Sequence, residues 1–174
     1  MKNLLTQQIV QSLINYDPET GLMIWSKARR GVKLGSVCGR INVHGYREIG
    51  IVNNLIHAHR IAWLYMTGVL PECDIDHINQ DRLDNRWANL RLATRSQNSA
   101  NVFAHKRKRA GNYLGVTYDT PRDKWRAQIR IGGKKTNLGR FVNEVDAAKA
   151  YNAAAIAEFG EYATINNLGQ ADAG

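Results

Sequence analysis

The segment 74–98, DIDHINQDRLDNRWANLRLATRSQN, contains the residue types that metal-assisted phosphodiester cleavage requires. Asp76 and His77 are adjacent, a polar stretch follows, Asn89 opens a short apolar run, and Asn98 lies farther along. In-line cleavage needs a general base for water, and histidine suits that role because its pKa lies near neutrality. It also needs a cation at the phosphorus centre, and Asp76 and Asn98 offer the oxygen ligands that Mg²⁺ prefers.

A plainer interpretation treats Asp76 and His77 as turn residues and DRLDNR as a solvated loop. For any one of these residues taken alone, that interpretation is the simpler one. Geometry adds a condition, because adjacent residues of a strand point to opposite faces. The two side chains therefore reach one scissile group only where the strand twists or ends.

The elements expected around these residues form a compact ββα unit over residues 74–101. Glycines and turn residues divide residues 1–60 into short strands, which predicts an antiparallel meander. The run HRIAWLYMTG predicts a helix from His59 that ends at Gly68. NLRLA alternates as a strand does, and TRSQ matches a capping box that starts a helix containing Asn98. All four side chains are then expected to converge on one site.

In order and spacing these residues resemble the HNH endonuclease family, specifically the homing branch found in phages and introns. The resemblance covers residues 15–101. It implies that His77 is the general base and that Asp76 and Asn98 bind one Mg²⁺ or Mn²⁺ ion. It also implies that Asn89 orients His77 and tightens the loop. Asn98 stands where the commonest family pattern has histidine, a variant seen in the homing branch.

Arginines surround the expected site, and two of them, Arg86 and Arg91, are expected to hold the DNA backbone through paired hydrogen bonds to phosphate. Surface ion pairs with Asp81 and Asp84 are the alternative for these side chains.

Three neighbouring residues receive supporting roles. Asp74 is a rival carboxylate on the same strand face as Asp76, and we rank it behind Asp76 as a metal ligand. His59 is expected to be a packed helix residue, although it recurs in the homing branch. Trp87 is expected in the core.

Composition favours a nucleic-acid partner and a globular chain. The net charge is +9 and the pI is near 9.8, which points to a nucleic acid before a membrane surface. The family resemblance makes double-stranded DNA the expected partner. No apolar run approaches the length of a membrane span, and Gln7 and Gln8 interrupt the place of a signal peptide's apolar core, so we expect a cytoplasmic protein. Cys38 and Cys73 lie far apart, so we expect two buried, reduced thiols and no structural zinc.

A second domain is expected after a basic linker at 102–111. The linker contains a run of cations that either crosses the DNA backbone or forms a basic tether, namely Lys106, Arg107, Lys108 and Arg109. Residues 112–168 predict three antiparallel strands, at 115–118, 124–131 and 135–141, packed on one helix capped by Asn143. The helix has an apolar stripe of five residues: Val145, Ala148, Tyr151, Ala155 and Phe159. With a tail at 169–174, the whole chain is predicted to be α+β.

The alternation of KWRAQIRI places Arg126, Gln128 and Arg130 on one face of this sheet. A sheet in the major groove can present Arg to guanine and Gln to adenine, whereas a merely solvated face is the alternative. Residues 111–167 resemble the plant ethylene-response-factor (Apetala-type) DNA-binding domain. That resemblance adds Arg122, Lys135 and Tyr118 as DNA contacts. Asp119 and Asp123 depart from its pattern.

These observations together predict a metal-dependent DNA endonuclease of the homing type, encoded by a phage or mobile element. We expect a monomer that nicks duplex DNA. The alternatives are a noncatalytic DNA-binding regulator and a structure-selective nuclease that acts on branched DNA.

Overall fold

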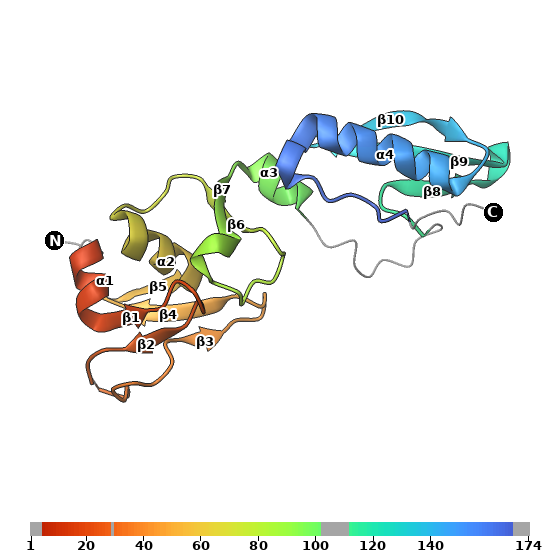
Figure 1. Cartoon of the computed structure of the whole chain (residues 1–174). Helices are drawn as coiled ribbons and strands as arrows, with labels where there is room; N and C mark the ends of the chain where they lie inside the picture. Colours follow the sequence, from red (N-terminus) through yellow and green to blue (C-terminus); the bar gives the residue numbers. More distant parts are fainter. Residues whose placement is uncertain (1–4, 29, 102–111, 169–174) are drawn as a thin grey trace. The chain divides into compact units, whose positions relative to one another are not determined.

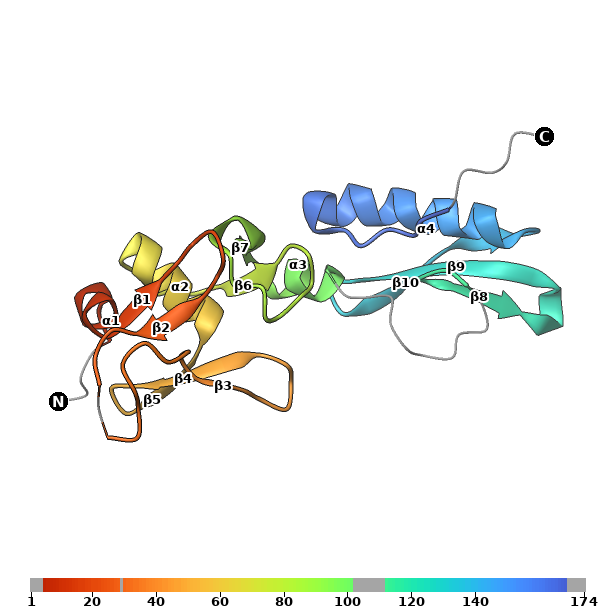
Figure 2. The same cartoon turned by 60° about the horizontal axis from the view of Figure 1, so that its bottom comes forward.

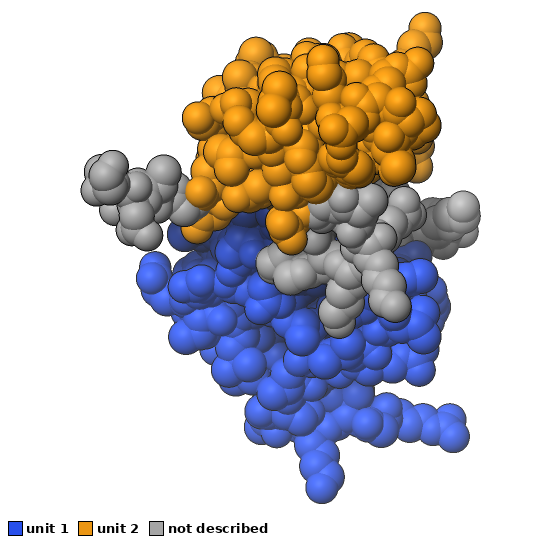
Figure 3. All heavy atoms as spheres, turned by 90° about the vertical axis from the view of Figure 1, so that its right-hand side faces the viewer, with its two compact units in different colours: residues 1–93 blue, residues 94–174 orange. Residues whose placement is uncertain are grey.

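The computed structural model describes residues 5–28, 30–101 and 112–168, and these form two compact units, Met1–Ala93 and Thr94–Gly174, coloured separately in Figure 3. Small antiparallel sheets and short helices confirm the predicted α+β class. The predicted linker at 102–111, with its four cations, and the predicted tail at 169–174 lie outside the described residues. No helix in the described parts of the chain is long and apolar enough to cross a membrane.

Two small antiparallel sheets form the first half of the first unit (Figure 1). One consists of β1 (Ile14–Tyr16) and β2 (Met23–Trp25). The other is the meander β3 (Arg40–Ile41), β4 (Arg47–Ile51) and β5 (Asn54–His57). The predicted meander is therefore confirmed for the second of these sheets.

Two helices pack on this framework. Helix α2 (Ala58–Thr67) ends at Gly68 in the left-handed conformation, as the sequence predicts. Helix α1 (Gln7–Leu13) was not predicted, because it spans only two turns of polar and apolar residues. Its Gln7 donates a hydrogen bond of 2.8 Å to the carbonyl of Tyr65, which fixes α1 against α2.

A hairpin follows α2 and carries the residues of the expected site. Strands β6 (Asp74–His77) and β7 (Leu90–Ala93) pair in antiparallel register, with the short 3₁₀ turn η1 (Trp87–Asn89) leading into β7. The next helix, α3 (Arg95–Ala100), begins with the predicted capping box, in which Thr94 and Gln97 cap each other's backbone amides. This helix belongs to the second compact unit.

The rest of the second unit is a three-stranded sheet with one long helix along one face, as Figures 1 and 2 show from two directions. Its strands are β8 (Val116–Asp119), β9 (Lys124–Ile131) and β10 (Lys134–Phe141), with β9 in the middle. Helix α4 (Glu144–Phe159) is capped by Asn143, whose side chain accepts from the Asp146 amide at 2.8 Å. The short turns η2 (Thr120–Arg122) and η3 (Gly160–Tyr162) connect these elements.

The predicted apolar stripe of α4 was wrong at one position. Val145 is exposed, and the small residues Ala147 and Ala148 pack against Val116 and Ala127 of the sheet instead. Alanine side chains let the helix approach the sheet closely, so the contact face is turned away from the larger Val145.

Two expectations about burial in the first unit also need correction. Cys38 is buried but Cys73 is exposed, because it lies in the irregular segment before β6. There Arg60 holds the backbone, donating to the Pro71 carbonyl at 2.8 Å. Trp87 is half-buried and packs on Trp63 with ring centroids 4.9 Å apart.

Candidate active site

Asp76 is held by an arginine on the neighbouring strand. The register of β6 and β7 places Asp76 opposite Arg91, and the guanidinium Nε and Nη2 atoms each lie 2.9 Å from Oδ2. Both side chains are nearly buried, at 5% exposed for Asp76 and 13% for Arg91. Arg91 lies where it neutralises and orients the carboxylate, and the DNA contact expected of it stays a prediction.

His77 is the next residue on β6 and is also buried, at 4% exposed. Its ring stands edge-on to that of His59, with centroids 5.1 Å apart. Its Nε2 atom lies 3.3 Å from the side-chain oxygen of Asn85. Burial lowers the pKa of His77 below its ordinary value, although the hydrogen bond to Asn85 opposes that shift. A neutral imidazole at neutral pH follows, which is the form that a general base requires.

Aromatic rings and a further imidazole form the wall behind His77. Tyr46 lies 5.5 Å from His59 and 6.2 Å from His77, measured between ring centroids. Burial, reinforced by the neighbouring His77 and His57, lowers the pKa of His59 to about 3. His59 is thus an uncharged packing residue at the start of α2, in the position expected from the sequence.

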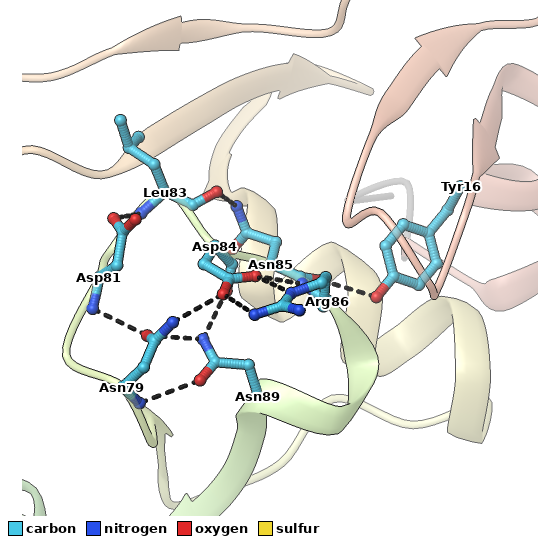
Figure 4. A network of polar contacts seen from close by, with 8 residues as sticks. All are labelled: Tyr16, Asn79, Asp81, Leu83, Asp84, Asn85, Arg86 and Asn89. Atoms are coloured by element: carbon cyan, nitrogen blue, oxygen red, sulfur yellow. Dashed lines mark hydrogen bonds and ion pairs between the residues drawn. The ribbon is translucent and has the colours of Figure 1, made fainter.

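Asn89 tightens the loop between the two strands, as Figure 4 shows. Its Oδ1 accepts from the Asn79 amide at 3.0 Å, and its Nδ2 donates to Asn79 Oδ1 at 2.9 Å and to the Asp84 carbonyl at 2.8 Å. These bonds join both ends of the loop. The second role expected of Asn89, orientation of His77, stays a prediction. Asn85, which the sequence analysis did not single out, contacts the His77 ring.

Arg86 extends from the same loop and pairs with Asp84. The closest approach is 2.6 Å, and the Arg86 side chain remains 53% exposed. The hydrogen bonds from Arg86 lower the pKa of Asp84 to about 2. The ion pair with Asp84, one of the two alternatives for Arg86, is therefore present. A DNA contact by the exposed guanidinium stays a prediction.

Tyr16 at the end of β1 and the turn that follows it support the loop from the other side. Tyr16 donates from its hydroxyl to the Asn85 carbonyl at 2.7 Å, and the Trp87 amide donates to the Pro18 carbonyl at 2.9 Å. Gly21 lies so close that a Cβ there would be 2.6 Å from the Arg86 nitrogen. Residues far apart in the sequence thus fix the loop that contacts His77.

The donor set near Asp76 fits one kind of metal site. Mg²⁺ and Mn²⁺ accept one carboxylate together with waters and substrate phosphates, and Asp76 supplies such a carboxylate. A site with three or more His, Cys, Asp or Glu ligands is absent from the described residues. Asn98, the second predicted ligand, lies on α3 in the second unit, so its role beside Asp76 stays a prediction.

Four of the predicted DNA-contacting residues, Arg126, Gln128, Arg130 and Lys135, share the sheet face opposite α4. Tyr118 instead packs on Trp125 on the other face, and Arg122 lies in the turn η2. Cross-strand pairing aligns Arg126 with Thr117 and Arg140, Gln128 with Asn137, and Arg130 with Lys135. This alignment follows from strand alternation, because Ala127 faces the helix.

Several of these side chains have partners within the sheet. Asp119 lies 2.8 Å from Arg140 and 3.5 Å from Arg122, and these arginines lower its pKa, Arg140 first. Arg130 donates to the Gly133 carbonyl at 2.6 Å. The Nε of Arg126 makes no hydrogen bond among the described residues.

Comparison with known proteins matches the hairpin region to one family. Residues 57–100 match the family model described as HNH endonuclease. An uncharacterized HNH endonuclease of Acanthamoeba polyphaga mimivirus is 30% identical over 112 residues, which are 63% of this chain and 57% of that protein. Protein 3.8 of Escherichia phage T7 is 32% identical over 81 residues, 46% of this chain and 66% of that protein. The chain thus spans less than two thirds of either relative, and no solved structure matches it significantly.

The predicted resemblance to HNH endonucleases is confirmed for residues 57–100, which include Asp76, His77 and Asn89. The family match does not extend to residues 111–167. The resemblance of that segment to an ethylene-response-factor domain therefore stays a prediction.

Proposed function

We propose that this chain is a metal-dependent DNA endonuclease that hydrolyses phosphodiester bonds in duplex DNA. One observation carries the proposal: Asp76, held by Arg91, and the buried, neutral His77 are consecutive residues at the end of β6, inside the segment that matches HNH endonucleases. A carboxylate for a cation and a basic imidazole for water are the two groups that in-line hydrolysis requires.

In this mechanism His77 takes a proton from the attacking water, and the surrounding rings keep bulk water away from its imidazole. Asp76, with Asn98 as the second expected ligand, would hold one Mg²⁺ or Mn²⁺ ion. When bound, that ion neutralises charge on the phosphate and on the leaving 3′ oxygen. Arg91 keeps the Asp76 carboxylate oriented, and Asn89 holds the loop closed around the base.

The exposed sheet face of the second unit is proposed to recognise the target sequence. Arg126, Gln128 and Arg130 share that face. Long donors of these types match the acceptor patterns of guanine and adenine in the major groove. Further contacts are expected from Arg86, Arg122 and Lys135 and from the linker cations. A monomer of the homing type, encoded by a phage or mobile element and acting in the cytoplasm, would nick one strand, because the described residues hold one such site.

Cleavage of supercoiled plasmid tests the activity directly. We expect relaxation in Mg²⁺ or Mn²⁺, none with chelator, and none with His77→Ala although that variant still shifts DNA in a gel. Retained cleavage by His77→Ala would contradict the assignment of the base. Binding without cleavage by the wild type on many inserts would favour the noncatalytic regulator, and a preference for junctions over linear duplex would favour the structure-selective nuclease.

A further inference from the structure

The imidazole of His77 meets a side-chain amide in the interior of the first unit. Its Nε2 atom lies 3.3 Å from Oδ1 of Asn85, and Asn85 is only 3% exposed. An amide oxygen accepts hydrogen bonds and never donates them. This contact is therefore a hydrogen bond only when Nε2 carries the proton.

The direction of the Asn85 amide is fixed by its other end. Nδ2 donates to the carbonyl of Leu83 at 3.0 Å. A half turn of the amide would point its oxygen at the Leu83 oxygen and set two acceptors against each other. The carbonyl of Leu83 thus forces Oδ1 toward the ring.

The backbone of Asn85 is fixed as well. Its own amide donates to Leu83 at 3.1 Å, and its carbonyl accepts the hydroxyl of Tyr16 at 2.7 Å (Figure 4). The close approach of Gly21 leaves the chain no room to shift toward β1 and β2. A side chain whose backbone and amide group are both fixed in this way can set the orientation of a histidine ring.

We propose that Asn85 is a positioning residue that holds the neutral ring of His77 as the Nε2–H tautomer, which makes Nδ1 the basic nitrogen. The inference rests on the proposed nuclease function of this site. Nδ1 takes one proton from water as the water oxygen bonds to phosphorus, and the P–O3′ bond breaks with its electron pair going to the leaving oxygen. The ring then carries both protons and a positive charge, and the hydrogen bond to Oδ1 strengthens.

Nitrogen NMR of the full chain with ¹⁵N-labelled histidine tests the tautomer without any cleavage assay. The chain has 5 histidines, so the signals of His77 are identified by their loss in His77→Gln. We expect wild-type His77 to show a protonated Nε2 and an unprotonated Nδ1. A protonated Nδ1 in the neutral ring would overturn the proposal.

Two substitutions at the amide separate positioning from general loop support. Asn85→Ala should give a mixture of tautomers and lower kcat about 10- to 100-fold, the usual cost of losing such an orienting partner, with KM for DNA unchanged. Asn85→Asp keeps an acceptor beside Nε2 but sets its second oxygen against the Leu83 carbonyl. It should keep the proton on Nε2, destabilise the loop and raise the pKa of the ring. A single Nε2–H tautomer in Asn85→Ala would contradict the proposal.

Asn79→Ala is the matched control, because it removes an amide from the same loop that bonds Asn89 and Asp84 rather than the ring. It should leave the tautomer of His77 unchanged. If it disturbs the tautomer as much as Asn85→Ala does, loop stability explains the effect and the positioning role fails. A wild type that shows the Nε2–H ring yet cuts no DNA would overturn the nuclease proposal while supporting the role of Asn85.

Discussion

Asp76 and Arg91 face each other across the β6–β7 ladder, with two guanidinium nitrogens 2.9 Å from one carboxylate oxygen. The same loop region contains a second Arg–Asp pair, Arg86 with Asp84, which lies at the surface. Because only the Asp76–Arg91 pair is buried, loss of one partner should cost more folding free energy there than at the Asp84–Arg86 pair. Removing one member of a buried pair leaves a charge in the interior, whereas water solvates the remaining member of a surface pair.

Arg91→Ala is expected to lower the free energy of unfolding by ~3–5 kcal/mol, because Asp76 stays buried without the guanidinium. Arg86→Ala, the matched control, should cost no more than ~1 kcal/mol. Urea unfolding followed by tryptophan fluorescence measures both. Equal losses of unfolding free energy in the two variants would contradict this expectation. They would show that groups other than Arg91 also stabilise the buried charge of Asp76.

Metal removal should reveal competition for the same carboxylate. If Asp76 binds Mg²⁺, the ion and Arg91 both neutralise it, so Mg²⁺ should raise the Tm of Arg91→Ala more than that of the wild type. Chelator should reverse the gain, and Asp76→Asn should abolish it. Equal shifts of Tm in Asp76→Asn and in the wild type would place the ion elsewhere.

Acid should destabilise the first unit through His59. Burial lowers the pKa of His59 from 6.5 to about 3, so between these values the unfolded chain binds more protons than the folded one. Stability from this residue is complete above pH 6.5 and falls as the pH decreases toward 3. His59→Phe keeps a ring of similar size and should flatten the decline of Tm between about pH 6.5 and pH 3, the window between the two pKa values.

The control for that experiment is His44→Phe, at an exposed position in the β3–β4 turn. It should retain the wild-type dependence of Tm on pH. A slope in His59→Phe as steep as in the wild type would assign the acid sensitivity to other groups.

Gly21 and Gly31 form a natural pair for testing the support of the loop. Their φ angles are 73° and 74°, so alanine meets the same backbone strain at both, roughly 1–2 kcal/mol. Only at Gly21 would the new Cβ clash, 2.6 Å from the Arg86 nitrogen, whereas nothing lies within 4 Å of it at Gly31. Gly21→Ala should therefore be the less stable variant in urea, and it alone should slow DNA cleavage, since its clash displaces the loop that holds Asn85. Equal stability and activity would show that the loop can move away without consequence.

The elements of the hairpin could be predicted because local signals define them. Thr94 and Gln97 form a capping box within four consecutive residues, and the alternation of β7 and β9 is visible in the residue types. Helix α1 has only a single side-chain cap, Thr6, as a local signal. It is held by the buried side chain of Val10 and by the contact of Gln7 with a distant carbonyl in α2. Its existence depends on tertiary packing that a local pattern does not contain.

The partners within the site were harder to predict than its position. Asp76 and His77 stood out by type, but Arg91 faces Asp76 only because of the strand register, which depends on the length and folding of the loop. Asn85 sits in a run of polar residues, and in the sequence nothing distinguishes it from its polar neighbour Asp84 as the residue that contacts His77. Which of the two is buried against His77 is decided by contacts from Tyr16, far away in the sequence.

If the second unit recognises DNA through its sheet, the arginines of the sheet should contribute more to DNA affinity than a lysine on the helix does. Arg126→Ala and Arg130→Ala should weaken binding to a selected target. Loss of a contact to a base should cost ~1–3 kcal/mol of binding free energy. Loss of a contact to a phosphate should reduce the slope of log K against log salt concentration by about 0.9. Arg130→Ala should also reduce discrimination against mismatched targets. Fluorescence anisotropy over a series of salt concentrations measures affinity and slope together.

Lys149→Ala serves as the control, because this exposed lysine lies on α4, which packs on the opposite face of the sheet, and pairs at 3.4 Å with Asp146. The substitution removes one positive charge, as each sheet variant does. The change in long-range electrostatic attraction between the protein and DNA is therefore the same in all three variants. Local contact then accounts for any excess loss in Arg126→Ala and Arg130→Ala. If the lysine variant loses as much affinity and slope as they do, the sheet face is a solvated surface and only the overall positive charge of the chain attracts DNA.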